Sequence, residues 1–261
     1  MIYIESKENN LFKFTKKLKE RRFRQKENKF ILEGLRLIEE AIKASMEIEY
    51  IILLEENTSI FEDSVLLSKS INKEKVYVLS KNLFTQIAAT ENPQGILAVV
   101  KNKEISIDLN GEFFLICDKV QDPGNLGTII RTAHAAGVDG IILTKGTVDI
   151  YNDKTIRSTM GSIFYLPIFY DDSDFTLIKK LKENNFNIVT TSLKESKNFF
   201  DENLKGKIVL AVGNEGNGIS DELFDLADKK VKIPMPGNAE SLNVAVAASI
   251  ILFEKVRQNM I

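Results

Sequence analysis

Five polar side chains stand beside glycines in three separate stretches of the chain, where they could take part in chemistry. They are Asn125 and Arg131 in "DPGNLGTIIRTAHAAG", Glu215 in "GNEGNGIS", and Ser241 and Asn243 in "PGNAESLN". Two glycines in the first turn of a helix, Gly124 and Gly127, cost roughly 1 kcal/mol each relative to alanine. They make sense if something approaches closely, either a packed second chain or a phosphate at the positive end of the helix.

The composition restricts the chemistry that these residues could perform. The chain has one histidine, His134, one cysteine, Cys117, and no Cys-x-x-Cys pair. This argues against a zinc site or a histidine-based triad, and we expect no bound metal. The reaction must therefore use Asn, Arg, Glu, Ser and backbone groups, or a borrowed cofactor. We interpret His134 as a packing residue beside its helix.

The three stretches follow segments that have the pattern of buried strands. We expect strands at 113–117, 140–144, 187–192, 207–212 and 229–233, with helices between them. Apolar strands that alternate with helices predict an α/β domain with a mostly parallel sheet covered on both faces. Ligands of such sheets bind at the carboxyl ends of the strands, so the three stretches should converge on one edge.

The last stretch leads into a helix, Val244–Phe253, that is apolar on nearly every face. Such a helix is expected to be buried on all sides. Ser241 alone could cap it, and Asn243 would then lie in the first turn, where asparagine is a mediocre helix former. Capping is one explanation of these polar residues, and a binding or catalytic site supported by a rigid element is the other.

The first hundred residues predict a smaller α/β unit. We expect helices at 11–26, 33–44 and 60–69, a short helix from Ser80, and strands at 48–54, 76–79 and 95–100. The polar segment 101–111 is short of packing residues and is predicted to be a linker. The resulting division is 1–100, linker 101–111 and 112–261.

One basic run and the absence of targeting signals bear on partners and location. Residues 11–30 contain nine Lys/Arg and two Glu, a local net charge of +7, with phenylalanines between the charges. This run is either a solvated helix face or a surface that neutralises nucleic-acid phosphates. A single cysteine, no signal-peptide pattern and no apolar run of roughly 20 residues predict a cytoplasmic protein outside the membrane.

Taken together, the three stretches resemble the motifs of the SpoU/TrmH branch of the SPOUT RNA methyltransferases. They occur in the family's order as "DPGNLGTIIRTAHAAG", "VGNEGNGIS" and "IPMPGNAESLNVAVAASIILFE". The segment "RSTMGSIFYLPI" (157–168) is similar to the family's middle region. "RFRQKENKFILEGLRLIEEAI" with "TENPQGILAVV" resembles the substrate-binding domain that precedes many members. The resemblance covers nearly the whole chain.

The resemblance implies transfer of a methyl group from S-adenosylmethionine to a ribose 2′-hydroxyl of RNA. It implies a C-terminal SPOUT domain with a parallel sheet and a deep trefoil knot, one of the rare exceptions to unknotted chains. A small N-terminal α/β RNA-binding domain would resemble a ribosomal-protein-like fold. The implied enzyme is a homodimer that associates through the SPOUT domain.

The resemblance also implies roles for individual residues. The implied catalytic residues are Asn125, Arg131, Glu215, Ser241 and Asn243. The implied cofactor-binding residues are Thr191, Gly213, Asn214, Ile233, Met235 and Leu242. Lys16, Lys17, Arg21, Arg22, Arg24 and Arg131 are expected to bind RNA. Arg131 is either the general base or a cation that grips phosphate and stabilises an alkoxide, since a guanidinium is not easily deprotonated.

Several alternatives differ in substrate or in class. The additional N-terminal domain favours ribosomal RNA as substrate, and a tRNA 2′-O-methyltransferase is the alternative. A non-catalytic RNA-binding or ribosome-assembly factor should have lost Arg131, Asn243 or the glycines, which are all present. A dinucleotide-dependent oxidoreductase would need G-x-G-x-x-G after the first strand, which this chain lacks. A base-methylating relative is disfavoured by Arg131 together with "SLN".

Overall fold

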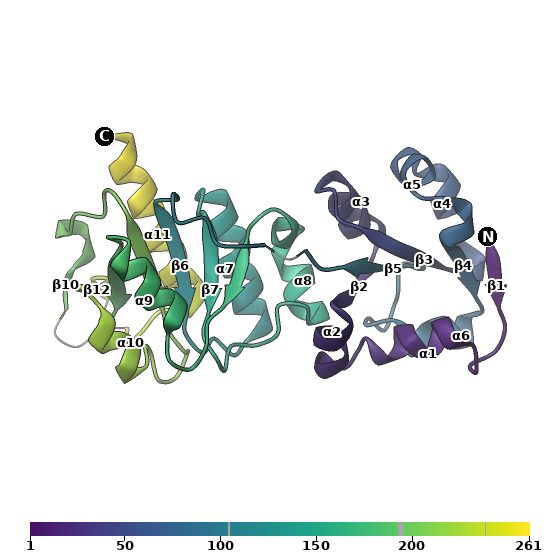
Figure 1. The fold of residues 1–261 in the computed structure, drawn as a ribbon, viewed down its shortest axis with the longest axis horizontal. Coiled ribbons are helices and arrows are strands. Elements are labelled where there is room, and N and C mark those ends of the chain that lie inside the picture. The colour runs from purple at the N-terminus through teal and green to yellow at the C-terminus, as the bar shows by residue number, and fades with distance from the viewer. Residues whose placement is uncertain (104, 193–195, 238) are drawn as a thin grey trace. The chain divides into compact units, whose positions relative to one another are not determined.

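The chain forms two compact units (Figure 1). The computed structural model describes residues 1–103, 105–192, 196–237 and 239–261. Unit 1 comprises Met1–Glu104 and Tyr151–Phe164, and unit 2 comprises Ile105–Ile150 and Tyr165–Ile261. Residue 104 of the predicted linker lies outside the described residues. The division differs from the predicted one because 151–164 packs with the N-terminal residues.

Unit 1 is built on a mixed five-stranded sheet with the order β1-β4-β3-β5-β2. β5 pairs antiparallel with β2 and β3, while β4 pairs parallel with β1 and β3. The strands are β1 Ile2–Ile4, β2 Lys29–Glu33, β3 Ile48–Leu54, β4 Val76–Leu79 and β5 Ile96–Lys101. The helices are α1 Asn10–Lys17, α2 Arg21–Glu27, α3 Leu35–Lys43, α4 Ser59–Asp63, α5 Val65–Ser70, α6 Lys81–Ile87 and α8 Asp153–Thr159.

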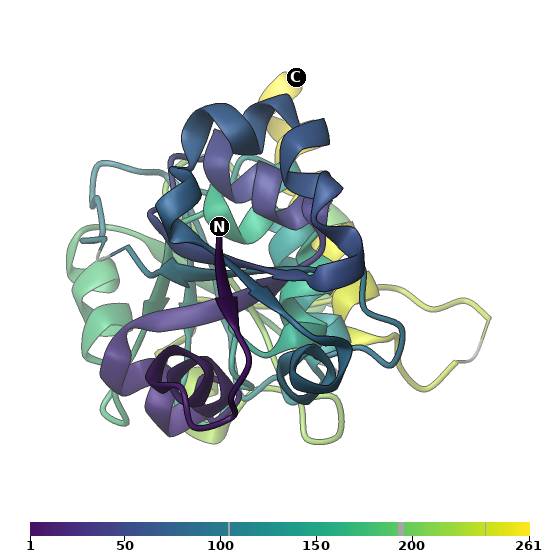
Figure 2. The ribbon, with the colours of Figure 1, turned by 90° about the vertical axis from the view of Figure 1, so that its right-hand side faces the viewer.

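Helices cover both faces of this sheet. Figure 2 shows α3, α4 and α5 on one face and α1, α2 and α6 on the other. Phe12 of α1 and Phe84 of α6 pack with Ile52 and Leu79 of the sheet in one buried cluster. The predicted α/β character of the N-terminal part is confirmed, and β1 and β2 are strands that the sequence did not predict.

The predicted basic helix at 11–26 is two helices. α1 ends at Lys17 with Leu18 as its cap, and α2 begins at Arg21. Arg24 is 9% exposed, and its Nη1 donates to the carbonyls of Leu18 (2.8 Å) and Lys19 (2.7 Å) at the break. The guanidinium thus satisfies carbonyls that the end of a helix leaves open, and this stabilises the turn.

Unit 2 has a seven-stranded, all-parallel sheet with the order β10-β12-β9-β11-β6-β7-β8. The prediction of a mostly parallel sheet is therefore confirmed. The strands are β6 Phe113–Cys117, β7 Gly140–Leu143, β8 Ile168–Tyr170, β9 Asn187–Thr191, β10 Lys197–Asn198, β11 Ile208–Val212 and β12 Lys229–Lys232. The helices are α7 Pro123–Ala135, α9 Thr176–Glu183, α10 Asp221–Leu226 and α11 Val244–Met260.

The two faces of this sheet carry different helices. Ile178 of α9 and Leu223 of α10 pack with Phe114, Ile188 and Val209 in one buried cluster. α11 packs against α7 and against β11. No helix among the described residues is both long enough and apolar enough to cross a lipid bilayer.

The C-terminal helix α11 is not buried on all sides within the chain, so that expectation is wrong for the single copy. Ala248, Ile251 and Leu252 are buried, but Val246 is 47% exposed and Phe253 is 48% exposed. An exposed apolar stripe on a helix of this kind marks a surface that a further partner could cover.

The segment 151–164 belongs to unit 1 because its side chains pack there. The ring of Tyr151 stacks on Phe30 at a centroid distance of 4.3 Å, and its hydroxyl is hydrogen-bonded to Asn102. α8 packs against β2. The chain thus leaves unit 2 after Ile150, adds one helix to unit 1, and returns at Tyr165.

Candidate functional site

The three glycine-containing stretches begin from neighbouring positions in the sheet of unit 2. β6 and β11 pair directly, with Cys117 opposite Val212 at their carboxyl ends. α7 begins shortly after β6, the glycine loop follows β11 at once, and α11 follows the segment after β12. Parallel strands end on the same edge, so these loops share one side of the sheet.

Side chains from all three stretches form one hydrogen-bond chain. Asn125 Nδ2 donates to Glu215 Oε1 at 3.0 Å, and Asn243 Nδ2 donates to Asn125 Oδ1 at 2.9 Å. Asn243 Oδ1 accepts from the backbone N–H of Ala245 at 2.9 Å. The expected convergence of the loops is confirmed, and the residue that caps α11 is Asn243 rather than Ser241.

The Glu215 carboxylate joins the glycine loop to the start of α7. It accepts hydrogen bonds from the backbone N–H groups of Gln121 (3.3 Å) and Asp122 (3.2 Å) as well as from Asn125. Burial acts to raise the pKa of Glu215, but hydrogen bonds from Asn125 and backbone N–H groups outweigh it and hold the pKa below its usual value. Glu215 is therefore a carboxylate at neutral pH.

The glycine loop is folded tightly on itself. Asn214 and Gly218 exchange two backbone hydrogen bonds, of 2.8 and 2.9 Å, and Gly218 has a φ of +72°. A Cβ on Gly213 would lie 2.2 Å from the carbonyl carbon of Gly218, so only glycine fits there. The fully buried Asp118 holds the end of the loop by accepting from the backbone N–H of Ser220 at 2.7 Å.

A cavity of about 610 Å³ opens beside the glycine loop. Its volume falls within the roughly 300–1,000 Å³ typical of small-molecule sites. All six residues expected to bind the cofactor line it: Thr191, Gly213, Asn214, Ile233, Met235 and Leu242. Glu215, Ser241 and Asn243 line it as well.

Some lining residues were not predicted from the sequence. Ser192 lines the cavity directly after β9, but the strand predicted at 187–192 included it, so it was not read as part of a loop. Phe224 of α10 and Lys232 at the end of β12 also line the cavity. No motif in the sequence distinguishes these two residues from ordinary helix and strand residues.

Arg131 stands apart from the cavity. It is an exposed residue of α7 and does not line the cavity. Within the described part of the chain, its guanidinium makes no hydrogen bond or ion pair. His134, one turn further along, stacks on Tyr165 with an interplanar angle of 3°, consistent with the packing role expected for it. Arg131 thus keeps its donors available for a ligand or a partner.

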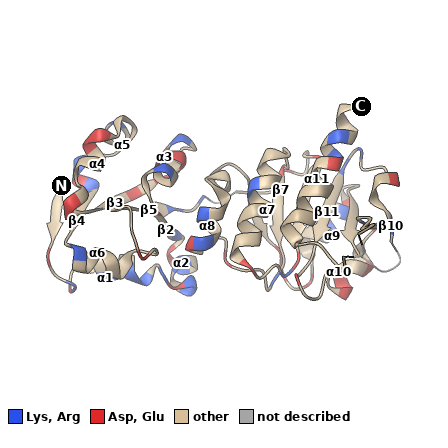
Figure 3. Cartoon of the chain, turned by 180° about the vertical axis from the view of Figure 1, so that it is seen from behind, with Lys and Arg blue, Asp and Glu red and all other residues tan. Residues whose placement is uncertain are grey.

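The residues expected to bind RNA through α1 and α2 fall into two groups. Lys16, Lys17, Arg21 and Arg22 are exposed, and Figure 3 shows the concentration of basic residues on these two helices. Lys16 Nζ donates to Gln86 at 3.0 Å, whereas Arg21 and Arg22 make no such bond with the residues that the structure describes. Arg24 points inward, onto the carbonyls of the α1–α2 break, and is unsuited to contact RNA.

Two family models match the chain. Residues 112–253 match the SpoU rRNA Methylase family, and residues 9–98 match the MRM3-like substrate binding domain. The first match alone covers more than half of the chain. The two matched ranges do not overlap, and the match to the substrate binding domain lies N-terminal to the match to the methylase family.

Curated proteins and solved structures resemble the chain over almost its whole length. The 23S rRNA (guanosine(2553)-2′-O)-methyltransferase RlmP of Bacillus subtilis is 40% identical over 97% of this chain and 98% of its own. The AdoMet-bound rRNA methyltransferase from Sinorhizobium meliloti superposes with a TM-score of 0.83 at 31% identity, covering 98% and 97% of the two chains. The AviRb methyltransferase from Streptomyces viridochromogenes in complex with AdoMet gives 0.85 at 27% identity, covering 97% and 98%.

Proposed function

Since the chain belongs to the SpoU rRNA methylase family, we propose that it transfers the methyl group of S-adenosylmethionine to a ribose 2′-hydroxyl of ribosomal RNA. The observation that carries this proposal is the hydrogen-bond chain from Glu215 through Asn125 to Asn243 beside a cavity of about 610 Å³. It unites the three motif loops at a site that is large enough for the cofactor.

The cavity is large enough for the cofactor, and its lining offers backbone and polar groups that could hold it. The close approach of Gly213 to Gly218 leaves backbone groups, rather than side chains, along one wall. We assign cofactor contacts to Thr191, Asn214, Ile233, Met235 and Leu242, which line the remaining wall. Leu242 is 37% exposed in the chain alone and would cover a bound ligand.

S-adenosylmethionine supplies a methyl group on a positively charged sulfur, which leaves as a neutral thioether, so no metal is needed. The methyl group moves to the ribose O2′ and the hydroxyl proton is lost. The residues of the chain must therefore align the hydroxyl and stabilise its developing negative charge. We propose that Asn125, Ser241 and Asn243 align the ribose hydroxyl. Glu215 would hold the side chain of Asn125 in position.

Arg131 is proposed to supply positive charge to the reacting ribose. Its guanidinium is always charged and presents five donors, which suits a phosphate or an alkoxide better than it suits proton abstraction. Its exposure and its lack of a partner among the described residues support this role. The proton of the 2′-hydroxyl would then pass to solvent or to a phosphate oxygen of the RNA.

We further propose that two copies associate through unit 2. The exposed Val246 and Phe253 of α11 lie on the helix that packs against α7, which carries Arg131. Covering these apolar side chains would complete the burial that the sequence of α11 predicts. The family resemblance also supports a trefoil knot, in which the segment before α11 passes through the loops at this edge.

The exposed basic residues of α1 and α2 are proposed to bind ribosomal RNA. We propose that the protein acts in the cytoplasm. Lys16, Lys17, Arg21 and Arg22 would bind backbone phosphates, which fix position without reading sequence. The match of residues 9–98 to a substrate binding domain supports this assignment.

The test incubates purified protein with radiolabelled S-adenosylmethionine and total RNA from a strain that lacks the gene, followed by digestion to nucleosides. We expect a labelled 2′-O-methyl nucleoside in the 23S fraction, lost on Arg131→Ala. Label in tRNA would change the substrate, and label on a base would change the reaction. No label despite measured cofactor binding would contradict the proposal.

A further inference from the structure

A second, smaller cavity lies within unit 1, between α8 and the N-terminal residues of the same unit. We call it the α8 pocket. Its volume is about 170 Å³, and it is lined by Ile31, Glu33, Leu37, Ile87, Asp153 and Arg157 among others. It is too small for the drug-sized ligands that occupy roughly 300–1,000 Å³. It has room for one planar group the size of a nucleobase.

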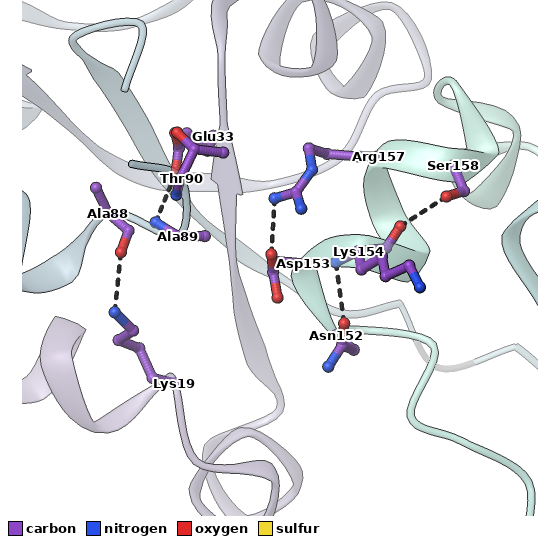
Figure 4. Close-up of polar contacts among 10 residues, drawn as sticks. All are labelled: Lys19, Glu33, Ala88, Ala89, Thr90, Asn152, Asp153, Lys154, Arg157 and Ser158. Atoms are coloured by element: carbon purple, nitrogen blue, oxygen red, sulfur yellow. Dashed lines mark hydrogen bonds and ion pairs between the residues drawn. The ribbon is translucent and has the colours of Figure 1, made fainter. Parts of the chain in front are cut away.

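The lining of the pocket combines apolar and polar side chains. The apolar surface comes from Leu18 at the end of α1, Ile31 of the sheet, Leu37 of α3 and Ile87 of α6. The polar wall comes from 152–157 of the segment that packs on β2. Figure 4 shows Asp153 and Arg157 extending from α8 toward the side on which Glu33 and Ala89 lie.

On the side of the pocket opposite α8, Glu33 and Lys19 already form hydrogen bonds within the protein. The Glu33 carboxylate accepts from the N–H groups of Ala89 (2.6 Å) and Thr90 (3.3 Å) and from the Thr90 hydroxyl. Lys19 Nζ donates to the carbonyl of Ala88 at 2.9 Å. These contacts hold the loop 88–90 in place and fix the shape of the pocket.

The polar wall, in contrast, retains unused hydrogen-bonding capacity. Arg157 Nη1 donates to Asp153 Oδ2 at 2.7 Å, which leaves most of the guanidinium donors and Asp153 Oδ1 without a partner among the described residues. Asn152 accepts from the N–H of Lys154 through Oδ1, and its amide N–H₂ is likewise unused there. This wall thus offers donors and an acceptor, whereas Glu33 and Lys19 on the opposite side already have partners within the protein.

We propose that the α8 pocket binds one unpaired nucleotide of the substrate RNA. The base packs on the apolar wall, Asn152 and Asp153 hydrogen-bond its edge, and Arg157 reaches its phosphate. Proteins that recognise RNA sequence bind splayed-out bases in this way, because the deep groove of an RNA duplex hides the base edges. This inference rests on the proposed function. It would let unit 1 recognise the RNA sequence near the methylation site, which the phosphate contacts of α1 and α2 cannot do.

The first experiment blocks the pocket. Leu37→Trp enlarges a half-buried lining residue, and Leu35→Trp on the same helix, which does not line the pocket, is the matched control. With ribosomal RNA as substrate, Leu37→Trp should raise KM for RNA roughly tenfold, the loss expected for one well-read base. The value of kcat and the Kd for S-adenosylmethionine should stay at wild-type levels, as they should for the control. An unchanged KM for RNA in a folded, active Leu37→Trp variant would overturn the proposal.

The second experiment separates base reading from structural support. Fluorescein-labelled, unstructured hexanucleotides of A, C or U are titrated into the full chain and into Asp153→Asn. If Asp153 reads a base edge, the variant should change the order of the three affinities. Equal weakening of all three would assign Asp153 a structural role and overturn base reading. This measurement needs no methyl transfer. An inactive wild-type protein would therefore contradict the proposed function, while nucleotide binding by the α8 pocket would still be tested.

Discussion

Asn243 donates a hydrogen bond of 2.9 Å to Asn125, joining two side chains that are 118 residues apart in the sequence. Each amide uses both of its ends: Asn125 donates onward to Glu215, and Asn243 accepts from the first turn of α11. The direction of every bond in the chain is therefore fixed, since turning either amide over would set donor against donor. The same asparagine acts as a helix cap and as a link between motifs.

This dual role makes Asn243→Asp an informative substitution. Aspartate caps helices about as well as asparagine, so the capping of α11 should be retained and any loss of stability should come from the contact with Asn125. Its carboxylate would face Asn125 Oδ1 as acceptor against acceptor, at a cost of about 1–3 kcal/mol. We expect kcat to fall roughly 5- to 150-fold with RNA binding retained. Thermal melts and single-turnover methylation measure the two effects, and full activity would remove Asn243 from the reacting site.

The Glu215 carboxylate is expected to anchor the glycine loop only while it is ionised. Its folded-state pKa is lowered below the unfolded value, so the stabilisation is fully present above about pH 4.3 and is lost as the pH falls through the folded pKa. Glu215→Gln should lose that acid-side dependence, because a neutral amide has no proton to gain. Its amide would also face backbone N–H groups, and we expect a roughly tenfold lower kcat at pH 7.5. Urea unfolding across pH 3–7 tests the first claim.

Gly213 should be the least tolerant glycine of the cavity. A Cβ at Gly213 meets the Gly218 backbone at 2.2 Å, whereas one at Gly216 meets only Asn214 Oδ1 at 3.6 Å. Gly213→Ala must displace the loop, at a cost of about 1–3 kcal/mol, and should weaken S-adenosylmethionine binding at least tenfold. Gly216→Ala is the control within the same loop. Isothermal titration of both variants measures this, and equal affinities would contradict the assigned cofactor wall.

Arg131→Lys tests whether the planar guanidinium matters beyond its charge. The side chain is exposed and unpaired within the described residues, so the melting temperature should not change. Lysine keeps the charge but cannot make paired, parallel hydrogen bonds, and we expect kcat to fall at least roughly 100-fold. A lysine variant that retained most of the activity would reduce Arg131 to a simple electrostatic contact.

Arg21 and Arg22 should contribute to RNA affinity through phosphates alone. Replacing both with glutamine removes two exposed cations, and the slope of log K against log salt should fall by about 1.4 in magnitude if both bind a single strand. The loss should be the same for RNAs of different sequence. Lys205→Gln in unit 2 provides an exposed control, and an unchanged slope in the double variant would place the RNA on another surface.

The central elements of the fold could be predicted because they depend on local patterns. The apolar runs of β3, β4 and β6 have the predicted bounds. The break between α1 and α2 could not be predicted, because it depends on where Arg24 places its guanidinium. β2 was missed because its five residues carry charges at both ends.

The site was predictable in its parts but not in its connections. Three loops after parallel strands must share an edge, and the residues that they carry do meet. Which asparagine caps α11, and which carboxylate receives the amide of Asn125, depend on distances that no sequence pattern contains. The α8 pocket was invisible for the same reason, since nothing near Asp153 signals that this segment packs on β2.

The passage of 151–164 into unit 1 has a consequence for engineering. A substrate-recognition module joined by a single tether could be cut off or transplanted between enzymes at that tether. Here a cut near residue 105 would strand α8 with the catalytic part and remove Tyr151 from its stacking partner Phe30. Chimeras should therefore exchange both segments of unit 1 together, and a change of substrate by fusion would require two junctions to be matched at once.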